Sequence, residues 1–179
     1  GAVGLVAGQI AKIRGARVIG IAGSDEKCKL LKDKFGFDET INYKISKSIR
    51  KDLAKVCPEG VNAYFDNVGG EITEGVAANL AFHARIALCG QISQYNNTKL
   101  PAGNLIMSWI LTKSVTLQGF IVRSYADRFD EALKHLTQWL NEGNLKYTET
   151  IIDGFEKLPD AFLGLFSGKN QGKMIVEAD

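Results

Sequence analysis

The chain has 179 residues, of which 45% are hydrophobic and 23% are charged, and this composition predicts a folded globular domain rather than a disordered segment. The net charge is +2, with acids and bases interspersed and no long run of Lys or Arg, so we expect no nucleic-acid partner. The three cysteines lack metal-ligand spacing, and no apolar run reaches the roughly 18 residues of a membrane span, so we expect no metal site, no disulfide framework and no membrane partner. Reduced thiols favour a cytoplasmic location.

Helix and strand patterns alternate along most of the chain. Apolar residues recur at helical spacing from Val3 to Ala11, residues 17–22 have the pattern of a buried strand, and Ser24 can cap the next helix. Strands that alternate with helices pair in parallel, so the pattern predicts an α/β fold with a doubly wound parallel sheet of the Rossmann type. The further elements expected are helices at 25–35, 46–56, 71–80, 104–112 and 125–141 and strands at 40–43, 61–67, 84–89 and 115–122.

The last part of the chain has a different pattern. Two strands, at 149–153 and 173–177, flank an apolar helix at 158–166. We therefore expect a nucleotide-binding domain at 1–147 and a separate C-terminal segment at 148–179.

The chain opens on Gly1-Ala-Val-Gly4, directly before the first helix pattern. In a dinucleotide-binding unit, glycines at this point let the backbone approach a pyrophosphate that lies on the helix N-terminus. Small residues at the start of a buried helix also serve close helix packing, so this motif alone does not decide between the two roles. The strand that would precede such a turn is not in the sequence, and we expect the chain to be a fragment.

The end of the strand at 17–22 carries a candidate phosphate site. Ligands of open parallel sheets bind beyond the carboxyl ends of the strands, where a site selective for NAD normally has an acid. This sequence has Gly23-Ser24 there, and Lys27 follows one helical turn later, so its charge could bind a 2′-phosphate, joined by Tyr43 from the next strand. The alternative is that residues 25–27 are only the solvated start of a helix, and spacing does not choose between these interpretations.

Two later strand ends combine glycine with polar side chains. Asn67 precedes Gly69-Gly70, which would let the backbone pass close to a flat ligand while the amide donates and accepts hydrogen bonds. Tyr95, after the strand at 84–89, is the candidate acid, because a phenol can bind an oxyanion or a ribose hydroxyl without ionising. The alternative for Asn67 and the two glycines is an ordinary turn, and the alternative for Tyr95 is a surface tyrosine without a ligand. Tyr95 and Lys99 have a Tyr-x-x-x-Lys spacing, but the segment is expected to be a loop, in which the pair would not share a face.

Motifs in one order along the whole chain carry a family resemblance. They are Gly1-Ala-Val-Gly4, Ala22-Gly-Ser-Asp-Glu-Lys27, Asn42-Tyr-Lys44, Phe65-Asp-Asn-Val-Gly-Gly70, Cys89-Gly-Gln-Ile-Ser-Gln-Tyr-Asn96, Gly119-Phe-Ile-Val122 and Gly168-Lys-Asn-Gln-Gly-Lys173. Together they resemble the prostaglandin reductase and 2-alkenal reductase family of zinc-independent medium-chain dehydrogenases/reductases, which includes leukotriene B4 12-hydroxydehydrogenase. The resemblance implies reduction of the carbon–carbon double bond of α,β-unsaturated ketones and aldehydes by NADPH, with hydride going to the β carbon and a proton to the α carbon.

The resemblance also implies a role for individual residues in binding NADP(H). Tyr95 would hold the nicotinamide ribose, with an indirect effect on catalysis, or polarise the enolate oxygen. The residues implied are Ala2, Val3 and Gly4 at the pyrophosphate, Lys27 and Tyr43 at the 2′-phosphate, Asn67 by the adenosine, Cys89, Gly90, Gln91, Ile92, Ser93 and Tyr95 along the nicotinamide side, Phe120, Ile121 and Val122 against the nicotinamide, and Asn170 from the C-terminal segment.

The sequence departs from the family pattern in what it lacks. Members carry an N-terminal GroES-like substrate domain and then the central strand of the sheet, so we expect two half-sheets here and a C-terminal segment that packs on the absent domain. The resemblance further implies a homodimer and a small enone substrate. The alternatives are a quinone reductase of the same superfamily and a nucleotide-binding module without catalysis, and the loop at 93–96 favours the enone reductase.

Overall fold

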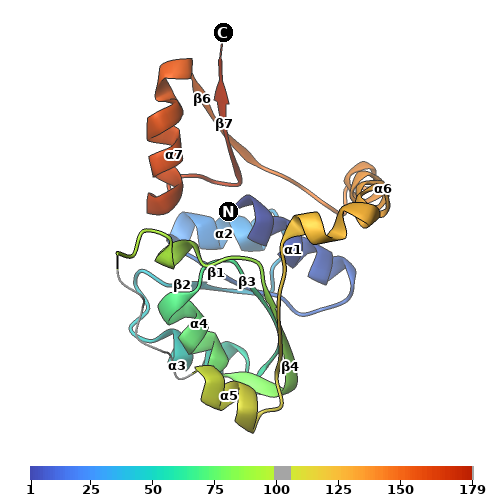
Figure 1. Ribbon diagram of the computed structural model, residues 1–179, viewed down its shortest axis with the longest axis vertical. Helices are drawn as coiled ribbons and strands as arrows, with labels where there is room; N and C mark the ends of the chain where they lie inside the picture. Colours follow the sequence, from blue (N-terminus) through green and yellow to red (C-terminus); the bar gives the residue numbers. More distant parts are fainter. Residues whose placement is uncertain (99–105, 179) are drawn as a thin grey trace. The chain divides into compact units, whose positions relative to one another are not determined.

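The computed structural model describes residues 1–98 and 106–178 of the chain (Figure 1). The chain divides into two compact units. The terminal unit consists of Gly1–Asn42 and Asp130–Asp179, and the central unit consists of Tyr43–Phe129.

The first half of the terminal unit is a small αβαβ arrangement. Ser24 caps α2 by accepting a hydrogen bond from the Lys27 amide at 3.2 Å, as its position in the sequence predicted. A Cβ at Gly20 would lie 2.8 Å from the Phe37 ring, so only glycine lets β1 approach this core residue. The elements are α1 (Ala2–Ile13), β1 (Ile19–Ala22), α2 (Asp25–Asp33) and β2 (Glu39–Asn42), and the core consists of Leu5, Val18, Phe35 and Phe37.

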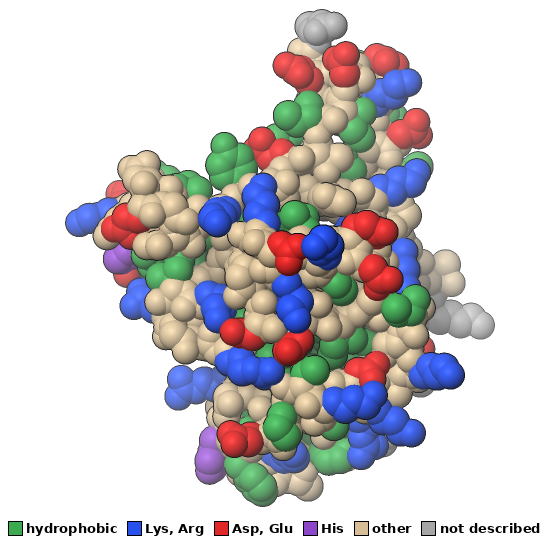
Figure 2. Space-filling view, turned by 180° about the vertical axis from the view of Figure 1, so that it is seen from behind, with side chains coloured by type: hydrophobic (Ala, Val, Ile, Leu, Met, Phe, Trp, Pro, Cys, Tyr) green, Lys and Arg blue, Asp and Glu red, His purple; other side chains and the backbone are tan. Residues whose placement is uncertain are grey.

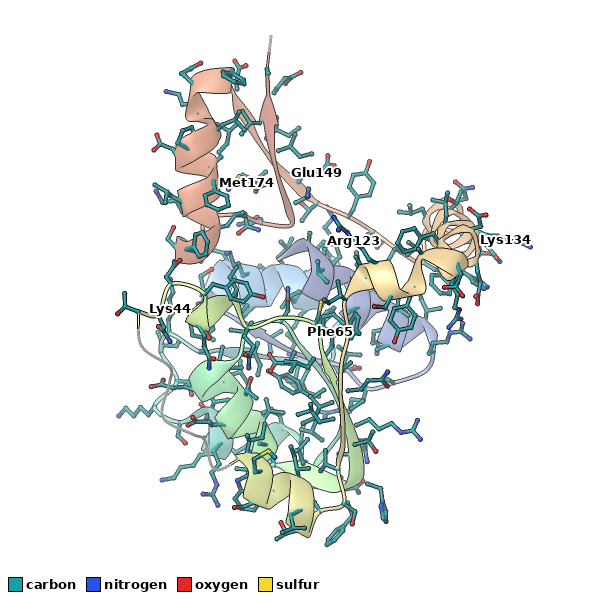
Figure 3. All side chains as sticks on the ribbon, viewed as in Figure 1. Lys44, Phe65, Arg123, Lys134, Glu149 and Met174 are labelled. Carbon is teal, nitrogen blue, oxygen red and sulfur yellow. The ribbon has the colours of Figure 1, made fainter. Side chains whose placement is uncertain are left out.

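The second half of the terminal unit is the strand-helix-strand segment. β6 (Glu149–Asp153) and β7 (Lys173–Glu177) pair in parallel and have the bounds expected from the sequence. Between them run η3 (Phe155–Lys157) and α7 (Leu158–Ser167), and Figure 3 shows the Met174 side chain lying between β7 and α7. The buried Gln9 amide of α1 donates to the Lys146 carbonyl at 2.9 Å and accepts from the Lys146 amide at 2.8 Å, which joins the two halves of this unit.

The central unit contains a three-stranded parallel sheet in the order β3-β4-β5. Its core lies on α4, where Val76 and Ala77 are buried together with Leu80 and Ile86 of β4. The elements are α3 (Ile49–Val56), β3 (Val61–Asp66), α4 (Gly70–Ala77), β4 (Leu80–Leu88), η1 (Ile92–Gln94), α5 (Ile106–Thr112), β5 (Thr116–Gly119) and η2 (Val122–Arg128), after which α6 (Phe129–Asn141) leads back to the terminal unit.

The two half-sheets expected from the sequence are confirmed. β1-β2 and β3-β4-β5 form separate sheets, and every strand pair in the described residues is parallel. No strand in residues 1–98 and 106–178 pairs with both β1 and β3.

Several element boundaries differ from the sequence expectation. β1 begins at Ile19 rather than 17, α2 ends at Asp33 rather than 35, α3 begins at Ile49 rather than 46, and α4 ends at Ala77 rather than 80. β4 begins at Leu80 rather than Ala84, because Leu80 is fully buried and the strand continues through an irregular register in which His83 has φ +60°. β5 ends at Gly119 rather than 122. The helix expected from Tyr125 begins at Phe129, since Tyr125 has φ −121° and interrupts the helical conformation.

None of the helices in the described ranges is long and apolar enough to cross a membrane. Acidic and basic side chains are interspersed on the face that Figure 2 shows.

Asp38 joins three elements of the terminal unit and allows a test of this fold. Its carboxylate accepts from Lys12 Nζ at 2.8 and 2.9 Å and from the Val18 amide at 2.6 Å. The hydrogen bond from Lys12, and secondly that from Val18, hold the pKa of Asp38 below its ordinary value. Because the group is one-third exposed, we expect Asp38→Asn to lower the free energy of unfolding by only about 1 kcal/mol in urea denaturation at pH 7.

The pH dependence has a definite sign. A depressed carboxyl pKa stabilises the fold above the unfolded value, near ~3.9, and this contribution is lost as pH falls through the folded pKa, so the difference between wild type and Asp38→Asn should shrink below about pH 4. Asp33→Asn is the control, since Asp33 forms only an exposed pair with Lys29. Equal losses for the two variants would contradict the role of Asp38.

Candidate functional site

α1 begins directly after Gly1. Gly1 occupies the N-cap, no side chain caps the helix, and its first turn has no acidic residue. A Cβ at Gly1 or Gly4 would meet nothing within 4 Å, whereas Val3 is half-exposed. The first backbone N–H groups of a helix are donors without intrahelical acceptors and carry partial positive charge, so this end can bind an anion.

Lys27 lies in the first turn of α2, where its backbone amide donates to Ser24. The Lys27 ammonium also donates to the carbonyl oxygen of Gly168, the left-handed residue that ends α7, with φ +67°. Two segments far apart in sequence, α2 and the end of α7, thus meet at this cation in the terminal unit.

In the central unit, the buried carboxylate of Asp66 organises the end of β3. Asp66 is 1% exposed, and its Oδ1 accepts from the amides of Val68 at 2.9 Å and Gly69 at 3.0 Å. Its Oδ2 accepts from the Thr73 hydroxyl at 2.6 Å, which in turn lies 3.3 Å from the Tyr64 hydroxyl. Burial raises the pKa of Tyr64, so this hydroxyl stays protonated. The network fixes the turn that begins at Asn67.

Asn67 and Tyr95 meet above Gly90. A Cβ at Gly90 would lie 2.5 Å from Asn67 Oδ1 and 2.8 Å from the Tyr95 hydroxyl oxygen, so the two polar groups occupy the space that a side chain would need. The Tyr95 oxygen accepts from the Gln91 amide at 3.1 Å, while the ring remains mostly exposed. Glycine at this position therefore lets both predicted ligand contacts approach the end of β4.

The loop after β4 is held against the turn after β3. The Ser93 amide donates to the Val68 carbonyl at 3.0 Å, and the Ser93 hydroxyl donates to the same oxygen at 2.5 Å. The amides of Cys89, at 2.7 Å, and Gly90, at 3.2 Å, donate to the Asp66 carbonyl. These bonds extend the β3-β4 pairing past the strand ends and give the two loops one fixed arrangement.

An aromatic cluster follows β5. The Phe120 ring lies 6.3 Å from Phe65, which Figure 3 labels, and 6.1 Å from Tyr125 in an edge-on contact. Ile121 and Val122 are exposed beside this cluster.

The predicted site residues divide between the units. Ala2, Val3, Gly4, Lys27 and Asn170 belong to the terminal unit, where Asn170 donates to the Gly172 carbonyl at 2.7 Å. Tyr43 and the residues from Asn67 to Val122 belong to the central unit, and Lys99 lies outside the described residues. Within residues 1–98 and 106–178, no group of three or more His, Cys, Asp or Glu side chains could hold a metal ion.

Sequence reasoning did not identify two supporting residues. Asp66 had a signal, since an acid at the end of a buried strand before two glycines is typical of a side chain that binds turn amides. Gly168 was quoted only as part of a motif, and its contact with Lys27, 141 positions away, has no local signal.

The Asp66 network can be tested by substitution. Asp66→Ala leaves two buried amides and the Thr73 hydroxyl without their acceptor, and we expect a loss of about 3 kcal/mol in the free energy of unfolding, measured in urea. Asp66→Asn keeps one oxygen for the amides and should lose less. The control is Asp127→Ala at an exposed aspartate, which should change the free energy of unfolding by under about 0.5 kcal/mol. An equally small change for Asp66→Ala would contradict the role of the network.

Comparisons with known proteins agree with this arrangement. The family model described as zinc-binding dehydrogenase matches residues 2–138. The chain is 46% identical to prostaglandin reductase 1 of Sus scrofa over 99% of its length and 54% of the relative's, and 41% identical to NADPH-dependent curcumin reductase of Escherichia coli (strain K12) over 98% and 52%. The crystal structure of CurA in complex with NADPH from Vibrio vulnificus, 48% identical, matches all of this chain and 54% of that chain with a TM-score of 0.94. The chain spans about half the length of the curated relatives that it matches.

Proposed function

The chain belongs to the zinc-independent medium-chain dehydrogenase/reductase family that includes the prostaglandin reductases, and on this premise we propose that it is the cofactor-binding part of an NADPH-dependent enone reductase. The reaction proposed is reduction of the carbon–carbon double bond of an α,β-unsaturated ketone or aldehyde. One observation carries the proposal: Lys27 lies in the first turn of α2, directly after β1, where the chain has Gly23-Ser24 in place of an acid and a cation can bind a 2′-phosphate.

The residues present fit NADPH by their chemistry. The uncapped amides of α1 suit the pyrophosphate, and Ala2, Val3 and Gly4 add no side chain bulky or acidic enough to oppose it. No acid stands at Gly23-Ser24 to bind a ribose 2′-hydroxyl, whereas Lys27, with Tyr43 in support, suits a 2′-phosphate. We assign the contacts with the rest of the cofactor to Asn67, the loop of Cys89, Gly90, Gln91, Ile92, Ser93 and Tyr95, the residues Phe120, Ile121 and Val122, and Asn170.

When bound, NADPH supplies the hydride for the β carbon. Gly90 lets Asn67 and Tyr95 approach the end of β4, and the Phe120 ring would offer an apolar surface to the nicotinamide. The Tyr95 oxygen accepts a hydrogen bond from the Gln91 amide. The O–H of Tyr95 can therefore donate to a ribose hydroxyl or to the enolate oxygen. The Asp66 network keeps Asn67 and Tyr95 in place without touching the ligand.

The substrate class rests on the names of the relatives and on one loop. Prostaglandin reductase and curcumin reductase both match over nearly the whole chain, and the Ser93-Gln-Tyr-Asn96 sequence resembles enone reductases more than quinone reductases. A quinone reductase and a nucleotide-binding module without catalysis remain the competing functions.

We also propose how this chain fits a longer protein. In the proposed division, the domain at residues 1–147 binds the nucleotide. The segment at residues 148–179 packs on a substrate domain that precedes this chain in its relatives. The exposed side chains of Phe155, Phe162 and Leu163 on and before α7 support an apolar contact of this kind. A homodimer in the cytoplasm is the proposed assembly and location.

The role of Lys27 predicts a change in cofactor preference. Lys27→Ala should weaken NADPH binding by roughly 10- to 100-fold in a fluorescence titration, because a charge-assisted bond to the 2′-phosphate is lost. Binding of NADH, which lacks that phosphate, should hardly change. Lys29→Ala, on the same helix but 79% exposed, is the control and should affect neither cofactor. Equal weakening of NADPH and NADH by Lys27→Ala would exclude the phosphate role.

The reaction itself is tested by following NADPH oxidation in the intact protein. Consumption driven by a simple enone supports the proposed function, consumption driven by quinones alone supports the quinone reductase, and binding without turnover of either supports the non-catalytic module. If the enone is reduced, Tyr95→Phe should lower turnover about tenfold, the size of one lost hydrogen bond of about 1.4 kcal/mol.

The matched control for Tyr95 is Tyr147→Phe. The two tyrosines are 64% and 63% exposed, so loss of a hydroxyl has the same general effect on the surface, but Tyr147, next to β6, is not among the residues assigned to the cofactor. An unaltered rate for Tyr95→Phe would remove Tyr95 from the site.

A further inference from the structure

The contact between Lys27 and the end of α7 has no part in the function proposed so far. We propose that the Gly168 carbonyl positions Lys27 for the 2′-phosphate, so that the selectivity for NADPH over NADH depends on the C-terminal segment. This inference rests on the proposed NADPH binding and names a positioning group that acts through Lys27.

The carbonyl is presented by a defined helix end. Gly168 has φ +67° and ψ +33°, and its amide donates to Leu165 while the Lys169 amide donates to Gly164 at 3.0 Å, so α7 stops in a left-handed glycine cap. The last carbonyls of a helix carry partial negative charge, which favours a cation beside them. A Cβ at Gly168 would lie 3.8 Å from Lys27 Nζ, an ordinary contact, so a side chain at this position would not displace the ammonium from the backbone carbonyl.

The opposite end of the lysine is fixed as well. Its backbone amide donates to Ser24 in the N-cap of α2, which places the Cα in the first turn of that helix. An ammonium has three N–H donors, so one can remain on Gly168 while the others bind a phosphate. The carbonyl therefore does not compete with the ligand. It limits the rotamers of a long side chain before binding, and this reduces the entropy that binding must overcome.

Such coupling is reciprocal. If the end of α7 raises the affinity for NADPH through Lys27, then NADPH must stabilise the end of α7 by the same factor, and NADH must not. The C-terminal segment would thus respond to the 2′-phosphate and not to the dinucleotide in general.

The first test compares two substitutions at Gly168 in the intact protein. Asparagine tolerates the left-handed conformation, so Gly168→Asn should keep the carbonyl in place, whereas the β-branched side chain of Gly168→Val opposes that conformation and should displace it. We expect Gly168→Val to weaken the binding of NADPH about fivefold and that of NADH less than about twofold. Gly168→Asn should bind both cofactors about as tightly as wild type. Equal weakening of both cofactors by Gly168→Val would overturn the proposal.

A double-mutant cycle separates this proposal from the proposed function. With Lys27→Ala already present, Gly168→Val should not weaken NADPH binding further, because the ammonium that the Gly168 carbonyl positions is gone. Additive losses would overturn the positioning role while leaving Lys27 as a phosphate contact. If Lys27→Ala does not discriminate between NADPH and NADH, the phosphate contact itself fails and the positioning role fails with it.

Hydrogen–deuterium exchange in the unsubstituted protein gives an answer even if Gly168→Val does not fold. The Lys169 amide, bonded to Gly164 at the end of α7, should exchange more slowly with saturating NADPH than with saturating NADH. Equal protection by the two cofactors would overturn the coupling.

Discussion

Parallel pairing of the strands is the constraint on which the candidate site depends. In a parallel sheet all strands run the same way, so their carboxyl ends lie at one edge, and the loops that follow them become neighbours. In the central unit this brings the loops after β3, β4 and β5 together, with Asn67, Tyr95 and Phe120 in one region. In the terminal unit the same rule places Ser24 and the start of α2 at the end of β1. The chemistry is concentrated where the backbone hydrogen bonds of the sheet end.

Strand ends leave backbone groups that need other partners, and in two places the structure satisfies them with aspartate side chains. Asp66 accepts from two turn amides and a threonine hydroxyl, and Asp38 accepts from Lys12 and the Val18 amide. Leaving a buried donor without an acceptor costs more free energy than a hydrogen bond contributes on balance. Each carboxylate therefore stabilises its turn chiefly by keeping these donors paired. The two acids differ in burial, and the nearly inaccessible Asp66 should matter more for stability than the partly exposed Asp38.

The C-terminal segment is part of the terminal unit's chemistry and not only a covering element. Gln9 binds Lys146, just before the segment, through both of its polar atoms, and Lys27 binds Gly168 within it, so polar groups join α1 and α2 to this part of the chain. The apolar side chains of α7, in contrast, are largely exposed in this chain. A segment with polar contacts to the nucleotide-binding part and an uncovered apolar face is suited to link cofactor binding to the rest of a longer protein.

The sequence by itself determined the kind, order and direction of the elements and the family. Hydrophobic periodicity and capping are local signals, which is why β6, β7 and the Ser24 cap were predicted at their observed positions and why the two half-sheets followed from the missing central strand. Only the tertiary structure decided the early start of β4 at Leu80, the Asp66 network and the contact of Lys27 with Gly168. These features depend on burial and on hydrogen bonds between residues distant in sequence, and no local pattern encodes which side chain a folded backbone will bring within reach.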